Sequence, residues 1–138
     1  MTGGILAKGN GEGEASRDDT RVVVVADMLF ASRVRGTAQA AGVKVATVGR
    51  ADALAGALAS GSVRLVLVDL ELRSGDPAAA IRQVRSDPSL ADLIIVGFAS
   101  HTNVAAIAAG RDAGADRVLA RSAFVRMLPD LLGEAAGH

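Results

Sequence analysis

The sequence contains no cysteine, no tryptophan and no tyrosine, and it has only three phenylalanines. The absence of cysteine excludes disulfide bonds, thiolate metal sites and a cysteine nucleophile. The scarcity of aromatic rings argues against the stacking platforms that bind nucleic-acid bases. Fifteen basic residues balance fifteen acidic ones, so no net positive charge attracts a phosphate backbone. We therefore expect no nucleic-acid partner.

Long apolar runs are missing as well. No stretch approaches the roughly 20 residues of a membrane-spanning helix, and the N-terminus lacks the charged-then-apolar order of a secretory signal. We expect a cytoplasmic protein with no membrane partner. Residues 1–20 are rich in glycine and charge and have little to bury, so we expect a flexible tail there. Residues 21–135 are predicted to form a single domain with its own core.

Short apolar runs alternate with segments of helical spacing from residue 21 onward. The run Val22–Val25 is β-branched throughout, which is typical of a strand buried on both faces of a sheet. Similar runs occur at residues 43–48, 63–68, 93–98 and 117–120. Five strands alternating with five helices predict parallel pairing, with helices on both faces. The expected fold is an α/β, flavodoxin-like, doubly wound five-stranded parallel sheet, a (βα)5 three-layer sandwich.

Capping residues indicate where several predicted helices begin. The third helix is expected to begin after Asp76 and the fourth after Thr102 or Asn103, because these side chains can accept hydrogen bonds from the first turn. Ser122 is expected to cap the fifth helix in the same way. Pro129 lies inside that fifth helix and is expected to kink or split it.

Polar residues directly follow four of the predicted strands. Asp27 follows the first, Asp69 the third, Ser100 the fourth and Arg121 the fifth. Because ligands of open α/β sheets bind beyond the carboxyl ends of the strands, these residues are candidates for one site. Two converging carboxylates, Asp27 and Asp69, would suit Mg²⁺, and one of them could act as an acyl-phosphate nucleophile. The alternative is that Asp27 caps a helix and Asp69 is a solvated turn residue.

The motifs VVVVAD, LVLVDLELRSGDP and GADRVLARSAF make residues 21–132 resemble the receiver domains of bacterial response regulators. The resemblance implies that Asp69 accepts a phosphoryl group from a partner histidine kinase. It also implies Mg²⁺ bound by Asp27, Asp69 and the backbone carbonyl of Glu71, although Ala26 replaces one acid of the family's acidic pair. The Glu71 side chain itself is expected to be an ordinary solvated loop acid.

Several positions depart from the receiver pattern. The hydroxyl that reads the phosphate is replaced by Ala99, and the neighbouring Ser100 should face the other way. The family's lysine is replaced by Arg121, which can pair with Asp69 or contact a phosphate; the ion pair is the favoured interpretation. The switch aromatic is replaced by Val118. Without the hydroxyl and the ring, we expect conventional switching to be lost.

Two functional hypotheses follow from these departures. The favoured one is a pseudo-receiver, not an enzyme, that signals by binding a histidine kinase or a downstream effector, with phosphorylation of Asp69 weak or absent. The alternative is a phosphorylation-competent single-domain response regulator that uses Asp69 and Mg²⁺. A flavin- or cobalamin-binding domain is disfavoured, because the chain lacks tryptophan and tyrosine and has no histidine two residues after Asp27.

The predicted fourth helix has a face of small residues at 104–110. These residues either permit close packing on the sheet or form a homodimer surface together with the fifth helix. The sequence leaves both interpretations open.

Overall fold

The computed structural model describes residues 19–59 and 61–136. The predicted tail at residues 1–20 lies, except for its last two residues, outside this part of the chain. The strands are β2 (Val22–Val25), β3 (Val45–Val48), β4 (Leu65–Asp69), β5 (Ile94–Ala99) and β6 (Arg117–Ala120). The helices are α2 (Met28–Ala41), α3 (Leu54–Ala57), α4 (Pro77–Arg85), α5 (Val104–Ala113) and α6 (Arg121–Ala135), with 3-10 turns η1 (Ala51–Ala53) and η2 (Pro88–Leu90).

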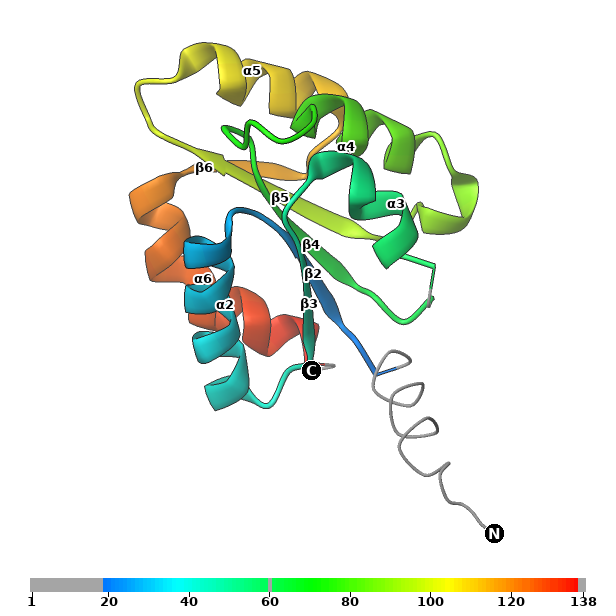
Figure 1. The fold of residues 1–138 in the computed structure, drawn as a ribbon, viewed down its shortest axis with the longest axis vertical. Helices are drawn as coiled ribbons and strands as arrows, with labels where there is room; N and C mark the ends of the chain where they lie inside the picture. The colour runs from blue at the N-terminus through cyan, green and yellow to red at the C-terminus, as the bar shows by residue number, and fades with distance from the viewer. Residues whose placement is uncertain (1–18, 60, 137–138) are drawn as a thin grey trace, which may run out of the picture.

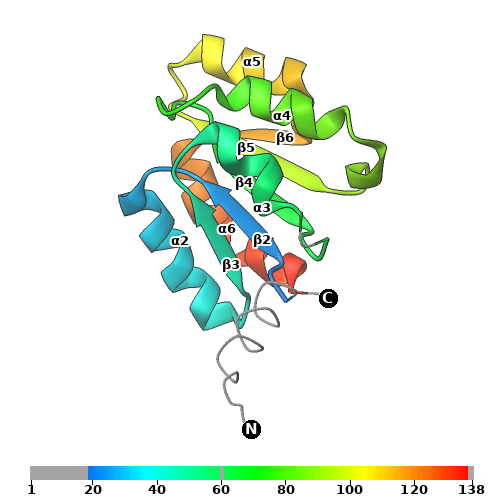
Figure 2. The same ribbon diagram turned by 45° about the vertical axis from the view of Figure 1, so that its right-hand side comes forward.

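All five strands form one parallel sheet in the order β3-β2-β4-β5-β6. Helices α2 and α6 lie side by side on one face, and α3, α4 and α5 cover the other (Figures 1 and 2). The predicted three-layer α/β sandwich is therefore confirmed. The order places β2 next to β4 at the centre, so the chain segments that leave these two strands emerge at the same edge.

The central strand β2 is buried on both faces, as its run of valines predicts. Each residue of Val22–Val25 has an exposed fraction of 0%. Val22 and Val24 belong to the core under α2 and α6, whereas Val23 and Val25 belong to the core under α3, α4 and α5. Full burial of a valine side chain contributes about 1.5–3 kcal/mol, so this strand stabilises both layers of the sandwich.

Two of the predicted helix starts are confirmed by side-chain caps. The Asp76 carboxylate accepts a hydrogen bond from the Ala79 N–H at 3.1 Å at the start of α4. At the start of α5 the cap is Asn103, whose Oδ1 accepts from the Ala106 N–H at 3.1 Å. Among the described residues, no helix is long and apolar enough to cross a membrane.

One prediction for the last helix is wrong, and of the kink or split expected at Pro129 the split does not occur. Ser122 does not cap it, because β6 runs straight into α6 and Arg121 is already the first helical residue. Pro129 does not split it either, since α6 continues from Arg121 to Ala135 with the proline inside. Pro129 is exposed, so the carbonyl that loses its helical partner can bind water instead.

The loop after β4 is anchored by Leu70, which fills a notch made by two glycines. A Cβ atom added at Gly97 of β5 would lie 2.9 Å from Leu70 Cδ1, and one at Gly110 of α5 would lie 2.7 Å from it. The glycines therefore let α5 and β5 close around Leu70, which has an exposed fraction of 9%. Of the two interpretations left open for the small residues at 104–110, close packing holds at Gly110, which is the buried residue of that stretch.

Candidate functional site at the carboxyl edge of the sheet

The polar residues predicted to share a site do meet at one edge of the sheet. Asp69 is the last residue of β4, Ser100 directly follows β5 and Arg121 directly follows β6. Asp69 has an exposed fraction of 5%, and among the described residues it is the one charged side chain that is buried. Asp27 lies at the same edge after β2, but its carboxylate caps α2 and does not contact Arg121.

Arg121 binds two carboxylates with the same nitrogen. Its Nη2 lies 3.3 Å from Asp69 Oδ1 and 2.9 Å from Glu71 Oε1. Asp69 Oδ1 also accepts a hydrogen bond from the Glu71 backbone N–H at 2.9 Å. The predicted ion pair between Arg121 and Asp69 is therefore confirmed, and one guanidinium is shared by two neighbouring carboxylates.

Phenylalanine rings form a floor beneath this guanidinium. Phe30, Phe98 and Phe124 are all the aromatic rings of the chain except its histidines, and they pack together, with ring centroids of Phe98 and Phe124 4.1 Å apart. The Arg121 Cζ lies 5.2 Å from the Phe98 centroid and 5.7 Å from that of Phe30. Cation–π attraction to the rings and ion pairs with the carboxylates thus both stabilise the position of the guanidinium.

The prediction of a solvated Glu71 side chain is wrong. Its carboxylate accepts hydrogen bonds from the Ser100 backbone N–H at 3.1 Å and from Asn103 Nδ2 at 2.8 Å, in addition to Arg121. These contacts leave the side chain only 27% exposed. The part played by Asn103 was missed as well; the available signal is that an asparagine cap has two amide N–H groups left over for another acceptor.

The two carboxylates respond to this environment in opposite ways. Burial raises the pKa of Asp69, and the Glu71 backbone N–H and the Arg121 charge oppose that rise. Hydrogen bonds from Asn103, then from Arg121 and the Ser100 N–H, lower the pKa of Glu71 below its ordinary value. Near neutral pH the fixed negative charge of the site is therefore most strongly stabilised on Glu71.

A pH-dependent stability difference should follow from the lowered pKa of Glu71. Its charged form stabilises the folded protein above the ordinary glutamate pKa of 4.5, and this contribution disappears as the pH falls through the lowered pKa. We expect wild type to exceed Glu71→Gln by about 1–2 kcal/mol in free energy of unfolding at neutral pH, and the gap to shrink below pH 4.5. Asp69 is present in both proteins, so its opposite shift largely cancels. Urea unfolding across the acid range measures the gap; a gap that stays constant would contradict the assignment.

The predicted Mg²⁺ ligands are the carboxylates of Asp27 and Asp69 and the backbone carbonyl of Glu71, and in this structure both carboxylates are engaged by other groups. Asp27 is exposed, and its Oδ1 accepts the Phe30 N–H at 2.8 Å as the cap of α2. Asp69 Oδ1 is paired with Arg121. Across residues 19–59 and 61–136, no group of three or more histidine, cysteine, aspartate or glutamate side chains is placed to hold a metal.

The remaining candidate contacts lie beside the ion pair. Ala99 has an exposed fraction of 0% and belongs to the core under α3, α4 and α5. The Ser100 hydroxyl hydrogen-bonds to the Thr102 hydroxyl at 2.9 Å, so Ser100 contributes its backbone N–H to the site. Val118 packs partly buried against the same core as Ala99.

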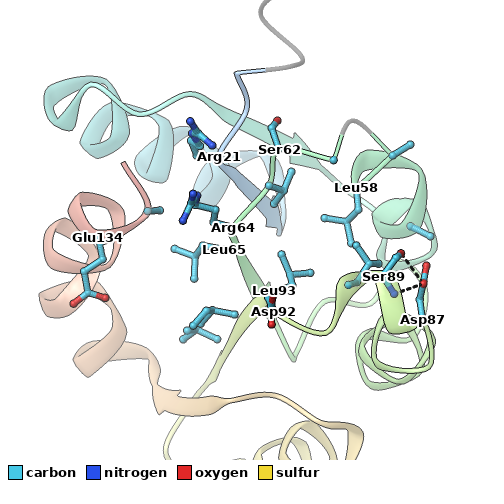
Figure 3. Close-up of a pocket in the computed structure, with 18 of the residues that line it drawn as sticks. Arg21, Leu58, Ser62, Arg64, Leu65, Asp87, Ser89, Asp92, Leu93 and Glu134 are labelled. Carbon is cyan, nitrogen blue, oxygen red and sulfur yellow. Dashed lines mark hydrogen bonds between the residues drawn. The ribbon is translucent and has the colours of Figure 1, made fainter. Parts of the chain in front are cut away.

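Two hollows in the surface differ in their relation to this site. A shallow one of about 570 Å³ adjoins it and is lined by Arg33, Ser100, His101, Ala120, Arg121, Ser122, Val125 and Arg126. A larger one of about 990 Å³ lies at the opposite, amino edge of the strands and includes Arg21, Arg64, Leu65 and Ile94 (Figure 3). Since ligands of such sheets bind at the carboxyl edge, the first hollow is the relevant one.

The structure is similar to that of a two-component response regulator from Clostridium difficile, with a TM-score of 0.70 and 15% sequence identity, over 84% of this chain and 94% of that one. This chain has the receiver fold. The receiver domain of NtrX from Brucella abortus matches with a TM-score of 0.69 and 21% identity, over 83% of this chain and 97% of that domain. In a longer NtrX structure the match covers 27% of that protein, so the receiver fold also occurs as one part of a larger chain.

A third similar structure was determined with a metal. The receiver domain of the sensor histidine kinase PA1611 from Pseudomonas aeruginosa, with magnesium coordinated in its active site cleft, has a TM-score of 0.69 and 17% identity, over 83% of this chain and 98% of that one. No protein-family model matches the sequence, and the comparison with curated proteins gives no match. The likeness therefore establishes the fold alone.

Proposed function

We propose that this protein is a pseudo-receiver: a cytoplasmic binding module, not an enzyme, that acts in signal transduction through a protein partner with phosphorylation of Asp69 weak or absent. The observation that supports this most directly is the shared ion pair, in which Arg121 binds both Asp69 and Glu71. This arrangement places a cation from within the chain against both carboxylates, so the site is stabilised without a phosphoryl group.

A phosphoryl acceptor needs an available carboxylate oxygen and a means to neutralise the incoming charge. Asp69 Oδ1 already accepts from the Glu71 N–H and from Arg121. Arg121 is in turn bound to Glu71 at 2.9 Å. Its positive charge is therefore shared with a second carboxylate and is less able to stabilise a phosphoryl group. Arg121 would have to loosen its contact with Glu71 to stabilise an added phosphoryl group, which favours slow phosphorylation or none.

Transmission of a phosphorylation signal also lacks its usual parts. A receiver of the expected type moves a hydroxyl towards the phosphate and an aromatic ring behind it, and here those positions are Ala99 and Val118. Ala99 is fully buried in the core, so no hydroxyl moves at that position. A ligand can shift an equilibrium only through contacts that differ between its two states, and this favours a module that binds its partner in one state.

A protein partner is favoured by apolar side chains exposed around the same edge. Met28 and Leu29 at the start of α2 have exposed fractions of 82% and 85%, and Val104 at the start of α5 has one of 72%. Exposed apolar residues near a polar site are typical of protein–protein contact. We propose a histidine kinase or a downstream effector as the partner, with a homodimer through α5 and α6 as a further arrangement.

Incubation with acetyl phosphate and Mg²⁺ tests this proposal. In a competent receiver, an Asp69 oxygen attacks phosphorus and acetate leaves, which adds one phosphoryl group to the protein. We expect intact-mass spectrometry to show no such adduct on the wild type, while a phosphorylation-competent receiver domain in the same reaction is modified. An adduct on wild type that is absent from Asp69→Asn would overturn the proposal and favour the phosphorylation-competent response regulator.

A further inference from the structure

An apolar hollow of about 990 Å³ lies at the amino edge of the sheet, opposite the ion pair of Arg121 (Figure 3). Its apolar lining includes Leu58, Leu65, Leu93 and Ile94. Ile94 has an exposed fraction of 48%, although it begins β5, a strand with neighbours on both sides. A large apolar side chain exposed in a hollow is typical of a surface that another segment covers.

The chain enters the sheet at the rim of this hollow. The Thr20 carbonyl accepts a hydrogen bond at 2.8 Å from the hydroxyl of Ser62, which lines the hollow. The N-terminal segment, residues 1–18, precedes this point and contains one pair of adjacent large apolar residues, Ile5 and Leu6. We propose that the N-terminal segment docks in the hollow of its own chain through this apolar pair. The inference goes beyond the proposed function and does not depend on it.

The length of the N-terminal segment allows this docking. Leu6 and Thr20 lie 14 positions apart, and an extended chain of that length spans up to about 46–50 Å. A hollow whose volume is typical of a ligand pocket is therefore within reach of the apolar pair. Because the segment is tethered at the rim, its effective concentration is on the order of 1 mM, so even a weak contact is populated.

Charge complementarity favours the same occupant. Arg21 and Arg64 directly precede β2 and β4 and lie side by side in the lining (Figure 3), where the Arg64 N–H donates to the Arg21 carbonyl at 2.8 Å. Neither side chain takes part in an ion pair with another described residue. Residues 7–19 carry four acidic and two basic side chains, so their net negative charge is complementary to this arginine pair. The acids of the lining lie beside η2 and on α6: Asp87, Asp92 and Glu134.

The absence of cysteine from the sequence allows a spin label to be placed at a single introduced site. The full chain carrying Thr2→Cys is labelled with a nitroxide, and the broadening of backbone amide signals is measured by NMR. The reference is the same labelled protein with Ile5→Ser/Leu6→Ser. We expect the amides of Arg64 and Ile94 to lose at least about twofold more intensity than in this reference, because the apolar pair brings the label to the hollow. Equal broadening in the two proteins removes the proposal.

A substitution in the hollow tests the other side of the contact. Ile94→Thr keeps a β-branched side chain at the start of β5 and should reduce the broadening at Arg64 to that of the serine reference. Val104→Thr is the matched control, because Val104 is 72% exposed at the start of α5, at the opposite edge of the sheet, and it should leave the broadening unchanged. Loss of broadening in both variants, or in neither, contradicts docking in the hollow.

A mixed sample separates docking within one chain from docking on a second copy. Spin-labelled protein without ¹⁵N is mixed with ¹⁵N protein that carries no label, and we expect no broadening at Arg64 and Ile94. Broadening there would assign the hollow to a second copy and overturn docking within the chain. Circular dichroism checks that each variant is folded; if Ile94→Thr is not, Arg64→Gln takes its place and should reduce the broadening at Ile94. None of these substitutions changes Asp69 or Arg121, so the outcome is independent of the phosphorylation test.

Discussion

Replacing Arg121 with methionine should lower the free energy of unfolding by about 3 kcal/mol at neutral pH. The substitution leaves the Asp69 and Glu71 carboxylates side by side without their shared cation, and Asp69 has an exposed fraction of only 5%. Breaking a buried ion pair by removing one partner typically costs about 3–5 kcal/mol. The lower end applies here because the Arg121 side chain is 38% exposed. Urea unfolding followed by circular dichroism measures the change.

Two variants separate the loss of charge balance from the loss of an arginine as such. Arg126 lies on the same helix and is exposed, so Arg126→Met should change stability by no more than about 0.5 kcal/mol. Arg121→Met/Asp69→Asn removes the buried charge along with its partner and should recover most of the stability lost in Arg121→Met. A double variant as unstable as the single one would show that Arg121 acts through packing on the rings and not through Asp69.

Truncation of Phe124 to alanine should cost about 3–5 kcal/mol, the usual range for a fully buried phenylalanine. Phe124 has an exposed fraction of 0%, and its ring is stacked on Phe98 with a centroid distance of 4.1 Å. The cavity would open beneath Phe98, which supports Arg121. We therefore expect both a lower urea midpoint and, if the variant stays folded, an altered NMR environment at the Arg121 guanidinium.

Two control substitutions show how large the stability loss in Phe124→Ala is by comparison. Phe124→Leu keeps most of the volume and should cost less than about 1.5 kcal/mol. Leu29→Ala removes a side chain that is 85% exposed, so it should stay within about 0.5 kcal/mol of wild type. A loss below about 1 kcal/mol for Phe124→Ala would mean that the aromatic floor contributes little to the core.

The sheet and the identity of its functional edge could be predicted from the sequence because both depend on local patterns. A β-branched run such as Val22–Val25 is typical of a strand that is buried on both faces. Parallel pairing then brings the residues that follow the strands to one edge, so Asp69 and Arg121 could be placed together although 52 positions separate them. Their ion pair needed only opposite charges at neighbouring strand ends.

The rest of the site depends on tertiary contacts that leave no local pattern. The direction of the Glu71 side chain is decided by Asn103, 32 positions further along the chain, and nothing in the loop itself indicates this partner. Asp27 had two plausible roles, and the structure gives it the helix cap. The capping rule failed at Ser122 because it assumes a loop residue before the helix, and β6 and α6 have none between them.

The packing of Leu70 connects the site to helix α5 on the surface of the molecule. Leu70 stands between the buried Asp69 and Glu71 in sequence, and its side chain is held between Gly97 of β5 and Gly110 of α5. The position of the peptide that carries both carboxylates is therefore tied by packing to the position of α5.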